Sequence, residues 1–315
     1  MNEQKQIKAA IAYLVRSKRK DIADLKRSLS LLDINFNDRF NYPVIIFHED
    51  FSDNLMENIR KSTHSKLQFA KVIFEIPDFL NKEEIPEFVF VDGSEFPIGF
   101  RHMCRFFSGL IFQQHILKDY DYLWRLDTDS FLFDKIDYDM FQFMHENNYV
   151  YGYIHILKEE PDAAKGFWDL VQKYIKENNI KPTFLNKFTI DGIWDRSYYY
   201  ANFEISKLDF WHSDDFLKYF DYVDKSGGIY KYRWGDTIIH FLAISMFIPE
   251  NLIHKFSDIS YQHQDFVNNY SINLSIFKKS NRFLIRKIIR LSNNLKKQSN
   301  IYRNLLDFIK KMVNL

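Results

Sequence analysis

The chain has 315 residues, 46% of them hydrophobic, which is enough for the core of one large α/β domain or of one domain with an appendage. A net charge of +1 removes any global case for nucleic-acid binding, and the single cysteine, Cys104, excludes an intramolecular disulfide and a cysteine-rich metal site. Residues 276–315 hold 11 Lys or Arg and one acid, so they carry +10 and leave about −9 on the other 275 residues.

The N-terminal quarter of the chain alternates strand and helix patterns. Buried strands are predicted at 8–16, 42–47 and 71–76, with a polar loop at 17–20. Helical spacing occurs at 53–62 and in the run that begins at Asp21 or Asp24, whose apolar positions are Ile22, Leu25, Leu29 and Leu32. This β-α-β-α-β order predicts a mostly parallel sheet with helices on its faces.

The rest of the chain continues this α/β pattern. Helices are predicted at 101–117, around 138–146, and at 167–177, 216–222 and 237–247; strands are predicted at 120–126 and 149–156, with an apolar step at 131–133. Residues 186–200 are irregular and aromatic, as in loops over a cleft. From 277 to 313, apolar residues recur at helical spacing with basic residues between them. We therefore predict a first domain of residues 1–275 and a basic amphipathic helical tail of residues 276–315.

Two aspartates separated by one residue, Asp127 and Asp129, follow the strand predicted at 120–126. The carboxyl edge of an open α/β sheet is where such folds bind ligands. Carboxylates there can hold Mn²⁺ or Mg²⁺, which can bridge the diphosphate of a nucleotide sugar and offset the charge of the departing diphosphate. The alternative is a capped turn, in which one of the two side chains accepts hydrogen bonds from backbone N–H groups.

A second run, Arg233-Trp234-Gly235-Asp236, precedes the helix predicted at 237–247. Gly235 permits close backbone approach, and Asp236 can cap the helix. His240 would then lie one turn into the helix, where a neutral imidazole is a suitable third metal ligand beside two carboxylates. Judged alone, the pattern favours the alternative, a core histidine on an apolar helix.

Glu204 and a pair of arginines complete the candidate residues. Glu204 lies between aromatic and aliphatic neighbours, where burial can raise its pKa and make it chemically useful; judged alone, a solvent-facing strand glutamate is favoured. Arg101 and Arg105 are four residues apart, so they share one helical face. There they can contact phosphate or acceptor, or pair with nearby acids.

These features occur together and in order, and with their surroundings the chain resembles the Kre2/Mnt1-type α-1,2-mannosyltransferases of glycosyltransferase family 15. The resemblance covers about residues 10–265. The matching stretches are RFNYPVIIF, FRHMCRFFSG, YDYLWRLDTDS, DYDMFQFMHENNYVYGY, ANFEISKLDFW, YFDYVDKSGGIYKYRWGDTIIH and IPENLIHKFSDISYQHQD.

The resemblance implies a GT-A fold, in which one nucleotide-binding α/β domain is merged with an acceptor-binding part. It also implies GDP-mannose as donor, Mn²⁺ (or Mg²⁺) as cofactor, and transfer with retention, forming an α-1,2 linkage on a mannose or other glycan acceptor. Asp129, with Asp127 near it, falls on metal and donor ligands, and His240 on the family's metal-binding histidine. Glu204 falls on the glutamate proposed as nucleophile or as stabiliser of the sugar cation.

The other implied site residues divide between the two substrates. Arg16, Asp21 and Arg105 are assigned to the donor nucleotide; Phe100, Arg101, Trp234, Asp236 and His263 are assigned to the acceptor or the cleft. The chain departs from the family pattern at three of its positions, with Phe100 for tyrosine, Asp127 for glutamate and Ser197 for cysteine.

Two other readings of the sequence stay open. The first is a transferase of the same fold that uses a UDP-sugar. It stays open because no local sequence feature identifies a guanine-binding site, so the choice of GDP-mannose depends on the resemblance alone. A non-catalytic carbohydrate-binding protein is the second alternative, although the retained Asp127, Asp129, Glu204 and His240 argue against a decayed site.

The ends of the sequence bear on where the protein works. Residues 1–8 are polar and no apolar run reaches about 18 residues, so neither a signal peptide nor a membrane span is predicted, and we expect a cytoplasmic protein. The basic tail suits an interfacial helix on an anionic leaflet. The alternative is a helix packed on the acidic body. The expected partners are thus a nucleotide sugar, a glycan acceptor and, through 276–315, a membrane surface.

If the tail binds membranes, the full chain should pellet with anionic liposomes more than a chain ending at residue 275, because apolar burial and charge attraction both depend on the tail. Co-sedimentation measures this. Neutral liposomes are the control, and equal pelleting of the two chains would remove the membrane interpretation.

Overall fold

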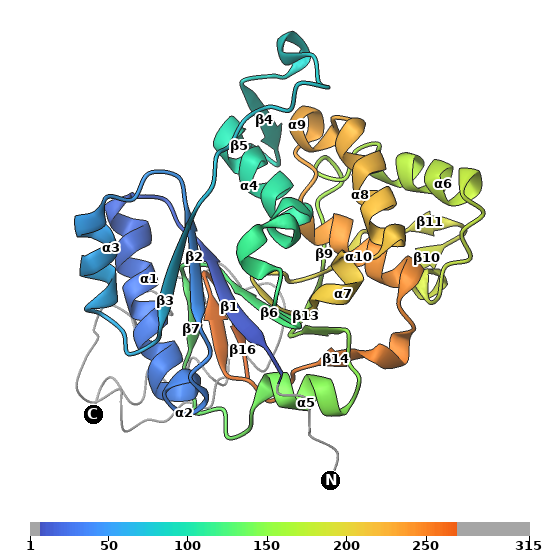
Figure 1. Ribbon diagram of the computed structural model, residues 1–315. Helices are drawn as coiled ribbons and strands as arrows, with labels where there is room; N and C mark the ends of the chain where they lie inside the picture. The colour runs from blue at the N-terminus through green and yellow to red at the C-terminus, as the bar shows by residue number, and fades with distance from the viewer. Residues whose placement is uncertain (1–6, 270–315) are drawn as a thin grey trace, which may run out of the picture. The chain divides into compact units, whose positions relative to one another are not determined.

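Strand β1 (Ala9–Leu14) lies inside a seven-stranded sheet of order β14-β8-β13-β6-β1-β2-β3 in this computed structural model, which describes residues 7–269 (Figure 1). The other strands are β2 (Val44–His48), β3 (Leu67–Lys71), β6 (Tyr122–Leu126), β8 (Tyr151–Tyr153), β13 (Phe203–Lys207) and β14 (Ile253–Lys255). Strand β13 is antiparallel to both neighbours, and every other adjacent pair is parallel. The predicted mostly parallel sheet is confirmed.

Side chains of β1 alternate between the two faces of the sheet, as the two-residue period of a strand requires. Ala9, Ile11 and Tyr13 join one buried cluster, and Ala10 and Ala12 join the other. Helices α1 (Arg19–Leu32), α3 (Asp53–Arg60) and α5 (Met140–Glu146) contribute to the first cluster; α4 (Ile98–Ser108), α6 (Phe167–Glu177), α7 (Leu208–Trp211), α8 (Asp214–Lys225), α9 (Gly228–Tyr232) and α10 (Asp236–Phe247) contribute to the second. The sheet is therefore covered on both faces.

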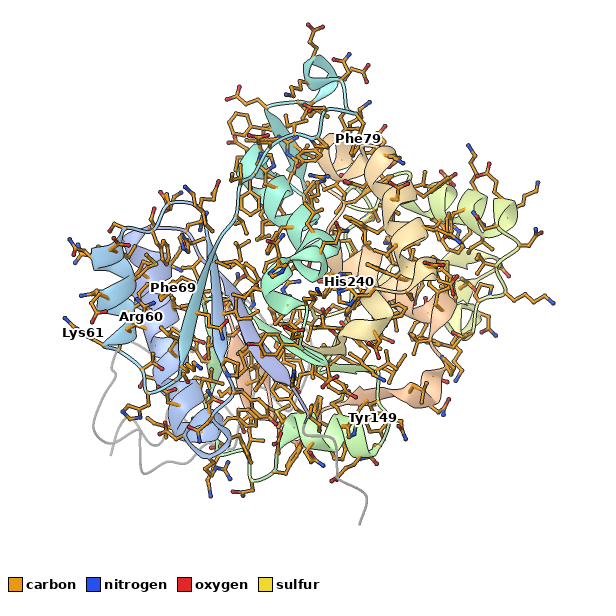
Figure 2. The ribbon with its side chains drawn as sticks, in the orientation of Figure 1. Arg60, Lys61, Phe69, Phe79, Tyr149 and His240 are labelled. Carbon is orange, nitrogen blue, oxygen red and sulfur yellow. The ribbon has the colours of Figure 1, made fainter. Side chains whose placement is uncertain are left out.

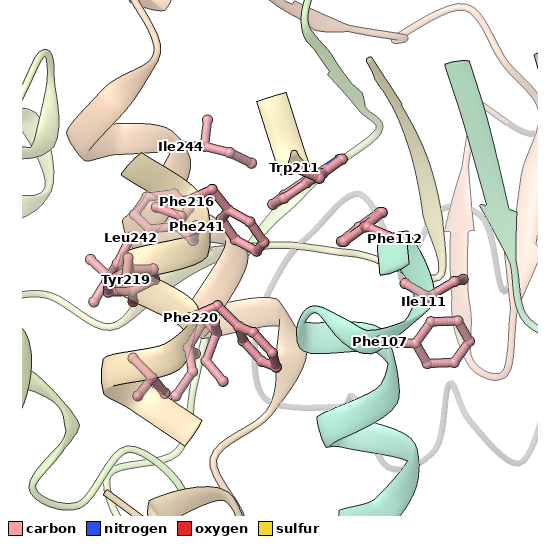
Figure 3. Close-up of a cluster of buried hydrophobic side chains, with 14 of the residues drawn as sticks. Phe107, Ile111, Phe112, Trp211, Phe216, Tyr219, Phe220, Phe241, Leu242 and Ile244 are labelled. Carbon is pink, nitrogen blue, oxygen red and sulfur yellow. The ribbon is translucent and has the colours of Figure 1, made fainter. Parts of the chain in front are cut away.

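Aromatic rings fill the second face. Figure 3 shows side chains from α4 and the turn after it opposite those of α7, α8 and α10. The rings of Phe112 and Trp211 are stacked with centroids 4.4 Å apart, and Phe216 meets Trp211 edge-on at 4.6 Å. Such pairs add directional contacts to the burial of large apolar surfaces. This packing fixes α10 against the sheet.

A small second sheet of order β16-β15-β7 lies beside the end of β6. It contains β7 (Ser130–Leu132), β15 (Tyr261–His263) and β16 (Phe266–Asn268). The pairing of β15 with β7 places His263 directly across from Ser130, the residue that follows Asp129 in the chain.

The remaining elements are short. They are α2 (Asp38–Phe40), a π-helical turn at Asp33–Asn37, and three pairs of strands: β4 (Phe88–Val91) with β5 (Ser94–Pro97), β9 (Ile156–Lys158) with β12 (Ser197–Tyr199), and β10 (Thr189–Ile190) with β11 (Ile193–Trp194).

Three predicted elements differ from the structure. The third strand is Leu67–Lys71, not 71–76, because this edge strand is half-exposed and lacks a continuous apolar run. The helix predicted at 101–117 ends at Ser108, and 3₁₀ turns follow at Leu110–Gln113 and His115–Leu117. A single strand at 149–156 is also wrong, since β8 and β9 are separate and pair with different strands.

The predicted basic tail, residues 276–315, lies outside the described residues, so the division after residue 275 stays a prediction. Within residues 7–269, none of the helices combines the length and the apolar character needed to cross a membrane.

Gly228 allows the chain to pack closely around Trp234. A Cβ at this position would lie 2.0 Å from Cζ3 of the indole, which is buried and donates from Nε1 to the Lys165 carbonyl oxygen at 2.9 Å. We expect Gly228→Ala to lower the free energy of unfolding by about 1–3 kcal/mol through overpacking. Gly99→Ala is the matched control, because its Cβ would meet nothing within 4 Å. Urea unfolding measures both, and equal stabilities would contradict this packing.

Candidate functional site

The predicted pair of aspartates lies in a turn at the carboxyl edge of the sheet. The Ser130 backbone N–H donates to the Asp127 carbonyl oxygen at 3.0 Å, and the Asp127 N–H donates to Ser130 Oγ at 3.1 Å. Ser130 therefore closes the turn, and the two carboxylates are left for other partners. The side chains of Asp127 and Asp129 keep 28% and 21% of their surface exposed, so both can reach a ligand.

His263 is the histidine that meets these carboxylates. Its Nε2 lies 3.0 Å from Asp129 Oδ1 and 3.5 Å from Asp127 Oδ2. Its position follows from the register of β15 with β7, which joins segments about 130 residues apart. From the sequence, His263 was predicted only to lie in the acceptor site or the cleft.

The other ring nitrogen of His263 is also held. Nδ1 lies 2.7 Å from Tyr200 Oη and 2.8 Å from Asn202 Nδ2, while Asn202 Oδ1 accepts a hydrogen bond from Tyr261 Oη at 2.9 Å. Burial lowers the pKa of His263, but Asp127 and Asp129 outweigh it and raise the pKa to about 11. Tyr200 and Asn202 were not predicted; residues that orient a ligating histidine carry no local signal in a single sequence.

The loop after β1 lies near this site. Asp21, in the first turn of α1, accepts a hydrogen bond from Arg16 Nε at 2.6 Å. The pKa of Lys20 in this loop is raised, first by Asp24 and then also by the charges of Asp129 and Asp21. The structure thus leaves Arg16 and Asp21 at the sheet edge where donor binding was predicted, and that role stays a prediction.

Arg125 is a buried cation inside β6, and its side chain is 6% exposed. It is ion-paired with Asp236, and its Nη2 lies 3.5 Å from Asp127 Oδ1. Its guanidinium also lies 3.5 Å from the centroid of the Phe107 ring. A charged residue within an apolar strand must have buried partners. Arg125 was not among the predicted site residues, although its place in the run YLWRL is a signal for it.

Glu204 is buried at 2% exposure and is the register partner of Arg125 on β13. Its Oε2 lies 2.8 Å from Tyr151 Oη and 2.9 Å from His240 Nδ1. Burial raises the pKa of the carboxyl, but His240, Arg125 and Tyr151 together hold it below its usual range. Burial thus acts in the predicted direction but is outweighed, and Glu204 is an ionised, preorganised carboxylate.

His240 does not join the aspartate pair. It lies on α10 in the interior of the protein, where Figure 2 labels it, and it is completely buried. Its Nδ1 contacts Glu204, and its Nε2 is buried without a hydrogen-bond partner among residues 7–269. The prediction that it is the third ligand beside Asp127 and Asp129 is wrong. Helix α10 is apolar on all sides, so the alternative of a core histidine describes its position correctly.

Arg101 and Arg105 share a helical face, but that face meets α8 and α9. Arg101 is fully buried and donates to the carbonyl oxygens of Pro86, Glu87 and Tyr230 at 2.6–2.7 Å. Arg105 makes two hydrogen bonds of 2.8 Å with the carboxylate of Asp224. The alternative of pairing with a nearby acid is confirmed for Arg105, and its contact with donor stays a prediction. Arg101 is not exposed, so its guanidinium is not available to acceptor in this structure.

The remaining predicted cleft residues lie mostly inside the protein. Trp234 is only 3% exposed and its ring packs against Phe167, so its predicted place in the cleft is wrong. Asp236 pairs with Arg125 and does not cap α10, whose N-cap residue is Gly235. Phe100 is half-buried, with the Arg233 guanidinium 5.1 Å from its ring centroid. Its predicted contact with acceptor stays a prediction.

A second group of possible ligands lies at the opposite edge of the sheet. Atoms of Asp33, Asp38 and His64 approach one another within 4.8 Å. Asp33, however, already accepts hydrogen bonds from the Thr63 and Ser65 hydroxyls at 2.6 and 2.5 Å. The carboxylate of Asp33 thus already accepts hydrogen bonds from the chain itself. These bonds join the end of α1 to the segment before β3.

The chemistry of Asp127, Asp129 and His263 fits a divalent ion such as Mn²⁺. Carboxylate oxygens and an imidazole nitrogen are suitable ligands for it, and the carboxylates are partly exposed to an approaching phosphate. The charges agree as well. Asp127, Asp129, Glu204 and Asp236 lie around Arg125 and His263. Asp127 and Asp129 are the two of these carboxylates that are partly exposed and can meet a cation.

Comparisons with known proteins give a consistent result. A family model described as "Glycolipid 2-alpha-mannosyltransferase" matches residues 1–284. The chain is 33% identical over 285 residues to a probable mannosyltransferase KTR3 of Saccharomyces cerevisiae, covering 85% of this chain and 69% of that protein. It is 32% identical over 277 residues to O-glycoside alpha-1,2-mannosyltransferase omh1 of Schizosaccharomyces pombe, covering 82% and 70%.

Solved structures agree with the sequence relatives. Core-mannan synthase A of Aspergillus fumigatus, in its Mn/GDP form, is similar at a TM-score of 0.77 and 26% identity, covering 85% of this chain and 78% of that one. The mannosyltransferase Ktr4p of S. cerevisiae in complex with GDP is similar at 0.75 and 27%, covering 84% and 72%. The predicted GT-A type fold is confirmed.

If Arg105 is structural, Asp224→Asn should destabilise the protein without changing donor binding. The substitution leaves a largely buried guanidinium, 15% exposed, without its anionic partner, for which we expect a loss of about 3 kcal/mol in the free energy of unfolding. The Kd for GDP in Mn²⁺, measured by calorimetry, should stay unchanged. A change of more than about tenfold, or 1.4 kcal/mol, would return Arg105 to the donor site.

Proposed function

We propose, from the premise that the chain belongs to the glycolipid 2-alpha-mannosyltransferase family, that it moves mannose from GDP-mannose to a glycan acceptor and forms an α-1,2 linkage with retention. The protein is a glycosyltransferase, and the proposal concerns its donor, linkage and stereochemistry. The observation that carries it is the meeting of Asp127, Asp129 and His263 at the carboxyl edge of the sheet. Two similar solved structures support it, since one is an Mn/GDP form and the other is a complex with GDP.

Asp129 and His263 would hold Mn²⁺, with Asp127 beside them. The ion would bind the diphosphate of the donor and offset the negative charge that grows on it as GDP leaves. His263 is well suited to ligation because Tyr200 and Asn202 fix the orientation of its ring. Asp127 is held in turn by Arg125, so the site is preorganised before donor arrives.

Glu204 would act on the sugar. The carboxylate is ionised and fixed, as required for a nucleophile in a retaining enzyme or for a group that stabilises the sugar cation. Its neighbour on β13, Phe203, pairs with Leu126, which is the residue before Asp127. Glu204 is therefore close to the aspartate turn. Two of its neighbours, Tyr151 and His240, occupy Oε2; Oε1 accepts no hydrogen bond within the described residues.

Donor identity rests on the family. Arg16 and Asp21, in the loop after β1, would contact the nucleotide, and no described contact distinguishes guanine from uracil. A UDP-sugar therefore remains the second candidate donor.

Binding of GDP with Mn²⁺ should raise the melting temperature, and UDP should do so less. A ligand present at 100 times its Kd adds about 2.7 kcal/mol of stability. Asp129→Asn and His263→Ala should lose the part of this shift that depends on Mn²⁺, because they remove the proposed ligands. Thermal shift with and without each ligand measures the effect within each variant.

His64→Ala is the matched control for this experiment, since it removes a histidine from the Asp33–Asp38 group and leaves the proposed site intact. It should keep the full response. Loss of the response in His64→Ala, with retention in His263→Ala, would contradict the assignment. A larger shift with UDP would replace the proposed donor.

Location and membrane contact belong to this proposal too. We infer that residues 276–315 contact an anionic membrane surface from the cytoplasmic side, where a lipid-linked or protein-linked glycan could be the acceptor. What supports this is the charge of +10 in that segment, together with its apolar spacing.

A further inference from the structure

Helix α10 is joined to the central sheet by two side chains four residues apart. Asp236 pairs with Arg125 of β6, and His240 contacts Glu204 of β13. Arg125 and Glu204 are themselves register partners across the β6–β13 pair. Two positions on one helical face therefore meet two neighbouring positions on one face of the sheet.

The spacing explains why this arrangement fits. Residues i and i+4 of a helix have Cβ atoms about 5–6 Å apart. Partners across an antiparallel pair of strands are about 4.5–5.5 Å apart. A helix lying across the strands can thus match both contacts at once. The partners are also chemically complementary, because the aspartate of the helix pairs with arginine and the imidazole N–H of the helix meets glutamate.

The surroundings of His240 determine where its proton lies. Its ring is close to Trp211, Phe112 and Phe216, with centroids 4.4, 5.7 and 6.5 Å away. Nε2 is buried and has no hydrogen-bond partner among residues 7–269. A proton on Nε2 would be an unmatched donor in an apolar cage, whereas an unprotonated nitrogen costs less. The nitrogen that faces Glu204 therefore carries the hydrogen, and Nδ1 donates to Glu204 Oε2.

Stability alone does not account for a histidine here. An apolar side chain of similar volume would fill the cage without leaving a polar nitrogen unmatched. What such a side chain cannot supply is the N–H that meets Glu204 at 2.9 Å. The second donor on the same oxygen, Tyr151 Oη at 2.8 Å, comes from β8 on the other side of β13. The carboxylate is thus clamped from two sides.

We propose that His240 is a positioning residue for Glu204: its Nδ1–H, with the Tyr151 hydroxyl, fixes Oε2 so that Oε1 is presented to the donor sugar. The inference rests on the proposed function, in which Glu204 acts on the sugar. His240 does not touch substrate or metal. It acts only through the orientation of the carboxylate, and it replaces the metal-binding role that the sequence predicted.

The test compares two amide substitutions at this position. His240→Asn places a donor near the place of Nδ1, whereas His240→Gln places its amide near Nε2, inside the aromatic cage. His240→Asn should keep kcat within about tenfold of the natural protein, and His240→Gln should lower it by about 100-fold, the scale of a small misplacement of a reacting group. The KM for GDP-mannose and the Mn²⁺ concentration for half-maximal rate should stay unchanged in both.

Melting temperatures measured alongside separate positioning from folding. Tyr151→Phe is the second variant, since it removes only the other donor on Oε2 and should lower kcat in the same way. Equal kcat values for the asparagine and glutamine variants, or a Mn²⁺ requirement raised in either of them, would overturn the positioning role. If the natural protein transfers no mannose at all, the proposed function fails instead, and the two failures are distinguishable.

Discussion

The buried charge of Arg125 is the constraint on which the site depends. Taking a guanidinium out of water costs several kcal/mol unless partners compensate it, and here Asp236, Asp127 and Glu204 surround it. Burial lowers the pKa of Arg125, but these anions outweigh burial and raise it, so the cation is permanent. One residue thereby ties α10 to the sheet, steadies the first aspartate of the turn and helps to keep Glu204 ionised.

Around that cation, two histidines have different tasks. His263, on a short strand of the second sheet, faces two partly exposed carboxylates and can bind a metal. His240, on a helix that is buried on all sides, faces one buried carboxylate and can only orient it. The two roles differ because the carboxylates that face His263 are partly exposed and the one that faces His240 is not. A metal ion that also binds phosphate must be accessible from solvent.

The sequence predicted the sheet, most helices and the aspartate turn, because each depends on local periodicity or on the end of one strand. It did not predict that His263 rather than His240 meets Asp129, since that depends on the pairing of two three-residue strands far apart in the chain. The shared face of Arg101 and Arg105 was predicted. The groups opposite it, Asp224 and three carbonyl oxygens, come from α8, from α9 and from the segment before β4. Tertiary contacts, not residue type, decided those roles.

The most direct test of the account is a crystal structure of the full chain with GDP and Mn²⁺, using anomalous scattering at the manganese edge. The account predicts one strong peak in contact with Asp129 and His263 Nε2 and with the GDP phosphates, while His240 Nδ1 stays on Glu204. A manganese peak at His240, or at Asp33, Asp38 and His64 alone, would contradict it.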